Sequence, residues 1–409
     1  MARVELCNVT KIYDRNVAVD DLSVVCEDSE LLVLLGPAGA GKTSTLKMIC
    51  GVESVSGGMI YIGGREVNAV APEKRNVGMV FENYALYPHM SVFENMAFPL
   101  RAPVRVSKSS KTEIAERVTQ VARTLQIEQL LQRMPTQLSG GQRQRVGLGR
   151  ALVRNPDAML LDEPIAHLDA KLRNSMRGEL KRLQKETGVT TLYATPDYAQ
   201  ALGMADRIAV LYAGKLQQLG PPMEIYGAPA NVAVAGMLSD PKINLLECQL
   251  HAQDGILYAA ASALQVTLPS DFGAHSATAA NRSCLLAIRP NDIRASRSPS
   301  PDCPIPARIQ LVEPIGSRMI VTVETSAQQL KLKVPFDQEW KTGEPLWLGV
   351  PPENVLLFDK DTGANLRTAP YADVRADRHA HPATPMLQHY GRTSREEGNR
   401  GTGDFGARQ

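Results

Sequence analysis

One short stretch, GPAGAGKT at residues 36–43, limits the possible folds more than any other. It matches the pattern G-x-x-x-x-G-K-[ST] at every fixed position, follows the apolar run LLVLL at 31–35 and precedes a segment with a helical pattern. In such a loop, glycines allow consecutive backbone N–H groups to face one concavity, and the helix N-terminus adds a partial positive charge. The alternative is an ordinary glycine-rich turn, but the flanking strand and helix favour a phosphate-binding loop.

This loop supplies the first group of candidate site residues. Lys42 would reach the outer phosphates of a nucleotide, and the hydroxyl of Thr43 can ligate Mg²⁺. We expect the nucleotide to be bound by Gly36, Pro37, Ala38, Gly39, Ala40, Gly41, Lys42, Thr43 and Ser44.

A second candidate group ends another apolar run, AMLLDEP at residues 158–164. A strand that ends in two acids places Asp162 at the carboxyl edge of the sheet, where α/β proteins bind ligands. Asp162 would hold Mg²⁺ directly or through water, and Glu163 would be the general base for an attacking water. Acidic residues often follow strands, so this motif indicates a nucleotide site only in combination with the phosphate loop.

The pattern around these motifs predicts an α/β domain. From residue 3 to about 235, short apolar runs at 31–35, 158–161, 189–194 and 207–212 alternate with longer amphipathic segments, as in buried parallel strands joined by helices. The clearest helix follows LLDEP, and its core-facing stripe consists of Leu168, Leu172, Met176, Leu180 and Leu183. We assign residues 1–236 to a nucleotide-binding domain with a helical subdomain at about 85–155.

Beyond about residue 240 the sequence changes character. Short strand-like runs at 257–268, 284–290, 319–325, 331–335 and 355–358 predict a small all-β domain over 237–366, with its boundary near 236–242. Residues 367–409 are polar and poor in β-branched side chains, so we expect a disordered tail. Its His379 and His381 could bind a metal, but a solvated low-complexity end is the simpler interpretation.

Composition argues against several classes of function. The chain has 45 Lys and Arg residues and 43 Asp and Glu residues, so it has no large overall positive charge that would attract nucleic acid. The six cysteines are scattered without a C-x-x-C pair, which indicates neither a disulfide framework nor a zinc site and suits a reducing cytosol. Without a secretory pattern or an apolar run of roughly 18 residues, the chain is not expected to cross a membrane by itself.

A third motif, LSGGQRQRV at residues 138–146, precedes the acidic strand. Ser139 followed by Gln142 fits a capping box, so the simplest interpretation is a well-capped helix start. The N–H groups around Ser139, Gly140, Gly141 and Gln142 would also form a second anion site, with no strand beneath it. One chain would then carry two half-sites for a triphosphate, with no evident way to bring them together.

Together, GPAGAGKT, VFENYALYPHMSV, LSGGQRQRV and LLDEP followed by HLDAKLR resemble the nucleotide-binding subunits of ATP-binding cassette (ABC) importers. Within these, the resemblance is to the subfamily that serves maltose, other sugars, glycerol phosphate and glycerol. It extends to about residue 366, since LAIRPNDI, VEPIGSRMIVTV and PPENVLLFDKDTG are similar to the regulatory lobes of these subunits. The implied fold is an α/β P-loop cassette ATPase with a helical subdomain, then an all-β domain of the oligonucleotide-binding (TOBE) type; the implied cofactors are ATP and Mg²⁺.

The resemblance also implies how the two half-sites are used. In the family, two subunits pair head to tail, so that the phosphate loop of one and the LSGGQ motif of the other enclose each ATP. Tyr13 resembles the aromatic residue that stacks on adenine, Ala18 the small contact beside it, and Asp169 the residue that crosses between the two sites. By default, a tyrosine in such a place would be core packing.

Partners and location follow from the same resemblance. Residues 82–95 resemble the segment that receives the coupling helices of a membrane subunit. The implied partners are a second ATPase subunit, two transmembrane permease subunits and, indirectly, a substrate-binding protein, but no nucleic acid. The implied location is the cytoplasmic face of the bacterial inner membrane.

Some positions depart from the pattern of the family. Pro196 stands where the family has a histidine that donates to the γ-phosphate, and proline has neither a side-chain donor nor a backbone N–H. As a structural alternative, Thr195 would be an N-cap and Pro196 the first helical residue. Glu82 replaces a glutamine that ligates Mg²⁺; a carboxylate still can, but it adds negative charge. Ala166 and His167 replace Ser-Asn, and His167 is most simply a solvated loop residue.

These observations predict an ATP-hydrolysing import subunit whose metal ligands are Thr43, Glu82 and Asp162. Its own site should turn over slowly, and it should pair with a different ATPase subunit. A sugar, glycerol phosphate or glycerol is the expected cargo. One alternative is a soluble cassette protein that acts on DNA or ribosomes, although such proteins usually carry a coiled-coil insertion or a second cassette. Another is a regulatory subunit that binds ATP without hydrolysing it.

Overall fold

The computed structural model describes residues 2–366, apart from 83, 102–109, 254–255, 262–263, 269–282, 327 and 337–338. The predicted tail at 367–409, with His379 and His381, lies outside the described residues. Among those that are described, no helix is both long and apolar enough to span a bilayer.

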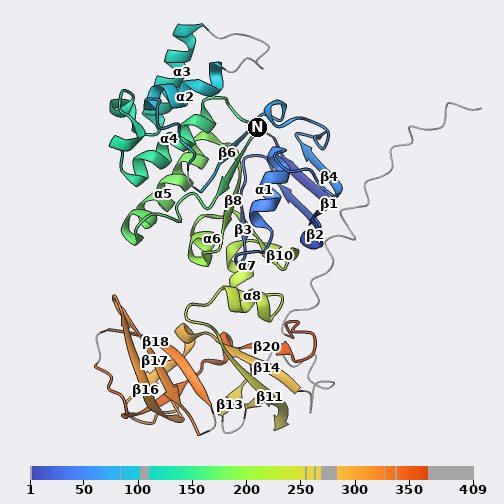
Figure 1. The fold of residues 1–409 in the computed structure, drawn as a ribbon. Helices are drawn as coiled ribbons and strands as arrows, with labels where there is room; N and C mark the ends of the chain where they lie inside the picture. The colour runs from blue at the N-terminus through green and yellow to red at the C-terminus, as the bar shows by residue number, and fades with distance from the viewer. Residues whose placement is uncertain are drawn as a thin grey trace, which may run out of the picture. The chain divides into compact units, whose positions relative to one another are not determined.

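A six-stranded sheet forms the centre of the first part of the chain (Figure 1). Its order is β10-β9-β3-β8-β7-β6, and neighbouring strands are parallel except for β10 and β9. The strands are β3 (Leu31–Leu35), β6 (Val77–Val80), β7 (Ala158–Asp162), β8 (Thr190–Thr195), β9 (Arg207–Tyr212) and β10 (Lys215–Gly220). The runs that predicted buried strands form β3, β7, β8 and β9, so that prediction is confirmed.

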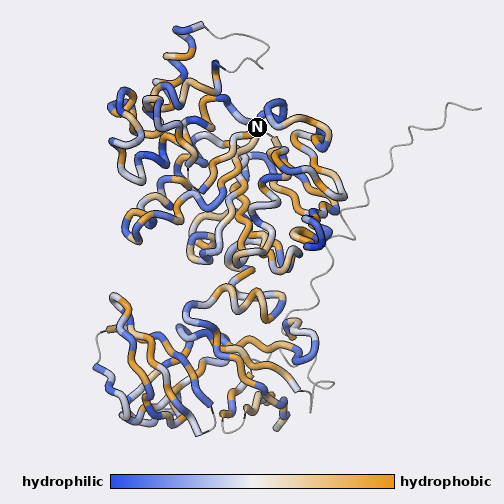
Figure 2. The backbone as a smooth tube through the Cα atoms, in the orientation of Figure 1, coloured by the Kyte–Doolittle hydropathy of each residue, from blue (hydrophilic) through white to orange (hydrophobic). Residues whose placement is uncertain are grey.

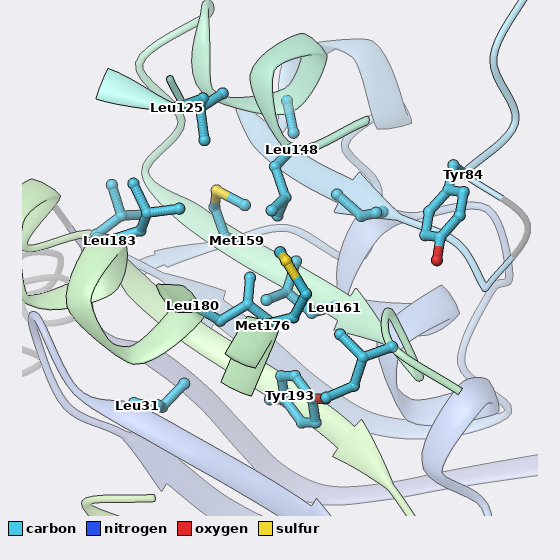
Figure 3. Close-up of a cluster of buried hydrophobic side chains, with 14 of the residues drawn as sticks. Leu31, Tyr84, Leu125, Leu148, Met159, Leu161, Met176, Leu180, Leu183 and Tyr193 are labelled. Carbon is cyan, nitrogen blue, oxygen red and sulfur yellow. The ribbon is translucent and has the colours of Figure 1, made fainter. Parts of the chain in front are cut away.

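Helices α1 (Lys42–Cys50), α5 (Ala170–Thr187) and α6 (Tyr198–Met204) pack on this sheet. In Figure 3, Met176, Leu180 and Leu183 of α5 lie close to Met159 and Leu161 of β7 within one buried cluster. Leu172 packs against the same cluster, which confirms the predicted stripe from Leu172 to Leu183. Leu168 is also buried in the cluster, but it precedes α5, whose N-cap is Asp169.

The first part of the chain also contains an antiparallel sheet of order β2-β1-β4-β5. Its strands are β1 (Val4–Tyr13), β2 (Asn16–Cys26), β4 (Gly57–Ile62) and β5 (Arg65–Glu66). No apolar run in the sequence predicted this sheet. Along β1 and β2 fully buried positions recur between partly exposed ones, whereas strands buried on both faces appear as continuous apolar runs.

A helical region follows β6 and contains α2 (Val92–Arg101), α3 (Lys111–Thr124) and α4 (Gly140–Leu152). Short 3-10 turns lie between α3 and α4 at Glu128–Leu130 and Pro135–Gln137, and another precedes β6 at Pro72–Lys74. Apolar residues of these helices share one buried cluster with the central sheet, and Figure 3 shows Leu148 of α4 there together with Leu125, the C-cap of α3. The helix that begins in LSGGQ is therefore packed directly against the sheet that carries the phosphate loop.

The last part of the described chain consists of two five-stranded sheets that follow α7 (Pro222–Gly227) and α8 (Val232–Met237). Their orders are β13-β12-β11-β14-β20 and β15-β19-β16-β17-β18. The strands are β11 (Asn244–Gln253), β12 (Ile256–Ala261), β13 (Leu264–Thr267), β14 (Ser283–Ile288), β15 (Arg294–Ser296), β16 (Ile305–Ile315), β17 (Arg318–Glu324), β18 (Gln329–Pro335), β19 (Pro345–Gly349) and β20 (Leu356–Asp359), with 3-10 turns at Pro290–Asp292 and Pro352–Asn354. Figure 2 shows hydrophobic stretches along these strands, and their buried side chains form a separate core. The predicted β-rich region is confirmed.

Candidate functional site

The phosphate loop joins β3 to α1 and is built around two left-handed glycines. Gly39 and Gly41 have φ angles of 79° and 96°, a region that favours glycine. A Cβ on Gly41 would also lie 2.5 Å from the carbonyl oxygen of Ala18. Gly41 is the N-cap of α1 and supplies no side-chain cap, so the first N–H groups of this helix are suited to an anion. Ala18, a predicted nucleotide contact, therefore lies directly against the loop.

Lys42 places a buried positive charge in this loop. Only 4% of its surface is exposed. Its Nζ donates to the carbonyl oxygens of Gly36 at 3.0 Å and Pro37 at 3.1 Å, and lies 3.7 Å from Oε1 of Glu163. These oxygen atoms offset the desolvation of the ammonium group. The charge thus lies where the outer phosphates of a nucleotide are expected.

Thr43 and Asp162 join the first turn of α1 to the end of β7. Thr43 Oγ1 donates to Oδ1 of Asp162 at 3.0 Å. Burial raises the pKa of Asp162, while the Thr43 hydrogen bond and the charge of Lys42 oppose this shift. A hydroxyl beside a carboxylate suits Mg²⁺, which usually takes one or two protein carboxylates together with waters and phosphates. In the described part of the chain no cluster of three or more His, Cys, Asp or Glu side chains is placed to hold a metal.

Glu163 has a backbone conformation that is uncommon for its residue type. Its φ is 47°, in the left-handed region, which costs on the order of 1–3 kcal/mol for a residue other than glycine. Its N–H donates to the carbonyl oxygen of Ala194 at 3.1 Å. Burial raises the pKa of its carboxyl group, Lys42 lowers it, and Glu82 and Asp162 raise it further. A strained acid with a raised pKa beside a phosphate loop has the properties of a general base.

The structure corrects the local interpretation of Pro196. Helix α6 begins at Tyr198, and its N-cap is Asp197, whose side chain accepts from two backbone N–H groups of the first turn. Thr195 is therefore not the N-cap, and Pro196 is not the first helical residue. Thr195 Oγ1 instead accepts from the N–H of Asp197 at 3.1 Å. Aspartate caps at least as well as threonine, and Pro196 lies exposed just before the cap.

Ser139 and Gln142 form the capping box that the sequence predicted. Ser139 Oγ accepts from the N–H of Gln142 at 3.4 Å, and Gln142 Oε1 accepts from the N–H of Ser139 at 2.9 Å. Helix α4 therefore begins at Gly140, followed by Gly141. Across the residues that the structure describes, no hydrogen bond or ion pair links this helix start to residues 36–44. Such contacts are not expected if the two motifs belong to separate half-sites.

Asp169 has a structural role that sequence analysis missed. It is the N-cap of α5, and its Oδ1 accepts from the N–H of Leu172 at 2.9 Å. Arg173, one helical turn later, donates to the carbonyl oxygens of Ala166 at 3.3 Å and Leu168 at 3.0 Å. An aspartate directly before an amphipathic helix was the signal for this cap. The contacts fix the loop that follows Glu163.

Glu82 and His167 lie in contact at the same edge of the sheet. They follow β6 and β7, which are neighbours, with Val80 paired to Leu161. His167 Nε2 lies 3.3 Å from Oε1 of Glu82, and their side chains are 62% and 53% exposed. His167 is thus solvated, as expected, but it is also paired with another residue that departs from the family pattern.

Tyr13 lies at the end of β1 and is half-buried. The Nζ of Lys11 lies 4.7 Å from its ring centroid. Lys11 is itself held by Glu53 at 2.9 Å. The partly exposed ring is compatible with stacking, so an adenine contact for Tyr13 stays a prediction.

Aromatic side chains gather around the segment predicted to receive a membrane subunit, residues 82–95, with Tyr87 inside it and Phe98 just beyond it in α2. The rings of Tyr87 and Phe98 are 4.9 Å apart, and Phe98 is 42% exposed. Arg150 of α4 lies 5.3 Å from the Tyr87 ring and donates to the carbonyl oxygens of Tyr84 at 2.8 Å and Ala85 at 2.6 Å. Together Tyr87, Phe98 and Arg150 line a groove. Aromatic and arginine side chains are the types enriched in protein interfaces.

Two family models match the chain. A model described as ABC transporter matches residues 19–166, which contain the phosphate loop, the LSGGQ motif and the acidic pair. A model described as TOBE domain matches residues 286–358, in the C-terminal β-rich part.

Three relatives are similar over nearly their whole length. The trehalose/maltose import ATP-binding protein MalK of Thermococcus litoralis is 41% identical over 374 residues, which cover 89% of this chain and 99% of the relative. The sn-glycerol-3-phosphate import ATP-binding protein UgpC 3 of Agrobacterium fabrum is 40% identical, with 88% and 98% covered. The trehalose import ATP-binding protein SugC of Mycobacterium tuberculosis is 39% identical, with 90% and 98% covered.

A solved structure shows the same fold for the first part of the chain. It is MJ1267, an ATP-binding cassette of an ABC transporter in its ADP conformation, with a TM-score of 0.50 at 23% identity. The match covers 56% of this chain and 96% of that chain.

Proposed function

Because this chain belongs to the ABC transporter family, as a P-loop cassette followed by a TOBE domain, we propose that it is the ATP-binding subunit of an importer. It hydrolyses ATP to drive uptake of a sugar, glycerol phosphate or glycerol. Relatives named for trehalose, maltose and glycerol 3-phosphate support this class of cargo. One observation carries the proposal: Lys42, the Thr43–Asp162 pair and Glu163 meet at one edge of the sheet.

In this proposal each contact of the site serves ATP hydrolysis. The start of α1 and Lys42 bind the phosphates. Thr43, Asp162 and Glu82 would hold Mg²⁺, which neutralises charge on the outer phosphates when bound. Glu163 orients the attacking water and accepts its proton.

The site of this subunit is proposed to hydrolyse ATP slowly. Pro196 offers no hydrogen-bond donor to the γ-phosphate, from its side chain or its backbone. Loss of one preorganised donor lowers a rate by about 10² to 10³. Lys42 and the Thr43–Asp162 pair remain in place, so the affinity for MgATP should be retained.

A second ATPase subunit would complete the site. The N–H groups at the start of α4 make no described contact with the phosphate loop of the same chain. We propose that Ser139–Gln142 closes on the ATP of a partner subunit, whose own LSGGQ motif closes on the ATP at Lys42. Since the capping geometry of Ser139 is intact while position 196 lacks a donor, the proposed partner is a non-identical ATPase.

The groove at Tyr87 and Phe98 is the proposed docking site for a permease subunit at the cytoplasmic face of the cell membrane. Phe98→Asp should reduce permease recovered with the tagged chain by about tenfold, because aromatic anchors contribute strongly to interfaces. Phe336→Asp is the matched control, since Phe336 is 57% exposed but lies in the C-terminal part. Equal recovery of permease by the two variants would argue against docking at this groove.

The ATPase proposal is tested on the transporter purified from its native membrane. With the catalytic acid of the partner ATPase changed to glutamine, we expect slow Mg²⁺-dependent hydrolysis that decreases further when Glu163→Gln is placed in this chain. Turnover as fast as in ordinary cassette ATPases, abolished by the same change, would contradict a weakened site. Recovery of identical ATPase chains only would contradict a non-identical partner.

A second candidate function is a regulatory subunit that binds ATP without hydrolysing it. It is favoured by Pro196 and by the additional carboxylate of Glu82. A single-turnover measurement with Glu163→Gln in this chain alone separates the two functions. An unchanged rate would indicate the regulatory subunit.

A further inference from the structure

We propose that His167 is a positioning residue for Glu82, and that this pair allows the site to accept MgATP despite its third carboxylate. The inference rests on the proposed MgATP site and adds a residue that the proposed function does not use.

Three carboxylates share the edge of the sheet where the phosphates are expected. Asp162 ends β7 and Glu163 directly follows it, while Glu82 follows β6. Glu82 is close enough for its charge to raise the pKa of both other acids, while Lys42 acts in the opposite direction. A triphosphate brings several further negative charges. An unpartnered Glu82 would therefore oppose nucleotide binding.

His167 is held in place to contact the outermost of these carboxylates. The N–H of Ala166 donates to the carbonyl oxygen of Glu163 at 3.1 Å. Arg173 holds the carbonyl oxygens on either side of His167, those of Ala166 and Leu168. The backbone on both sides of His167, at Ala166 and at Leu168, is thus held by hydrogen bonds.

The loop that carries Glu82 is anchored independently. The N–H of Tyr84 donates to the carbonyl oxygen of Phe81 at 2.9 Å. Arg150 then holds the carbonyl oxygens of Tyr84 and Ala85. Tyr84 and Ala85 both have left-handed φ angles, 59° and 44°, so this turn has a specific shape that the arginine maintains.

The contact of 3.3 Å between His167 Nε2 and Glu82 Oε1 therefore joins two anchored loops. One leads to the proposed permease groove at Tyr87, and the other leads to Asp169. By engaging one carboxylate oxygen, His167 holds Glu82 in a defined position and leaves its second oxygen available for a metal. Since both side chains are more than half exposed, the expected effect is modest.

The experiment measures MgATP affinity without hydrolysis. The assembled transporter carries Glu163→Gln in this chain, and binding of a fluorescent ATP analogue with Mg²⁺ is titrated with His167→Asn, Glu82→Gln and both changes. We expect His167→Asn alone to weaken binding by about three- to fivefold. When Glu82 is already Gln, His167→Asn should change affinity by less than about twofold, because no carboxylate remains to be positioned.

Matched controls make the result specific. His251→Asn, at an exposed histidine of β11, should leave affinity unchanged, and each variant should keep the melting temperature of its parent. Equal losses from His167→Asn in both backgrounds, or no loss in either, would overturn the role of His167. Absence of MgATP binding in the Glu163→Gln parent would instead contradict the proposed function.

Discussion

Pro196→His is expected to raise the ATPase rate of the assembled transporter by about 10²-fold when the catalytic acid of the partner ATPase has been changed to glutamine, so that only the site of this chain is measured. The reason is that an imidazole at this position would supply a preorganised donor to the γ-phosphate, which proline cannot. The position tolerates the change, since Pro196 is exposed and the cap of α6 is formed by Asp197. Loss of proline should lower stability by only about 0.4–1 kcal/mol. The rate is measured under multiple turnover with saturating MgATP.

Pro196→Ala is the matched control for this prediction. It also removes the proline ring and restores a backbone N–H, but it supplies no side-chain donor. A gain in Pro196→His that Pro196→Ala does not share, and that Glu163→Gln removes, would assign the slow rate to the missing donor. Equal rates in the histidine and alanine variants would show that position 196 does not limit hydrolysis.

Local sequence patterns predicted the parts of the site that depend on neighbouring residues. GPAGAGKT predicted a loop between a strand and a helix, and the structure has β3 and α1 on its two sides, because such a loop is recognised from consecutive residues. The Ser139 capping box also follows from residues three apart. The continuous apolar runs identified β3, β7, β8 and β9 for the same reason.

Contacts between distant segments could not be predicted in this way. The Glu82–His167 pair depends on β6 lying beside β7, and Arg150 reaches Tyr84 and Ala85 from another helix. The prediction that Thr195 caps α6 was also wrong. Thr195 and Asp197 are both good N-cap residues, and only the structure shows that Asp197 is the one used. Contacts between segments that are distant in the sequence are therefore the part of the site that sequence patterns predict least well.

Gly140→Asp separates the structural interpretation of the LSGGQ motif from the functional one. An aspartate in the first turn of α4 interacts favourably with the helix dipole, and its Cβ would meet only the end of the flexible Leu168 side chain, at 3.2 Å. If the motif is only a helix start, the variant should be as stable as the parent and fully active. If the motif closes on the partner's ATP, a carboxylate there repels the γ-phosphate. We then expect transport-coupled hydrolysis to fall by about 10²-fold or more.

Gly178→Asp provides the control for added charge, because Gly178 is an exposed residue of α5 and an added Cβ there would have no neighbouring atom within 4 Å. It should leave hydrolysis unchanged. In Gly140→Asp, MgATP should still bind at the site that contains Lys42, since that half-site belongs to a different part of the same chain. Loss of hydrolysis with retained binding and stability would place Ser139–Gln142 at the ATP of a neighbouring subunit. Full activity would leave the motif as a helix start alone.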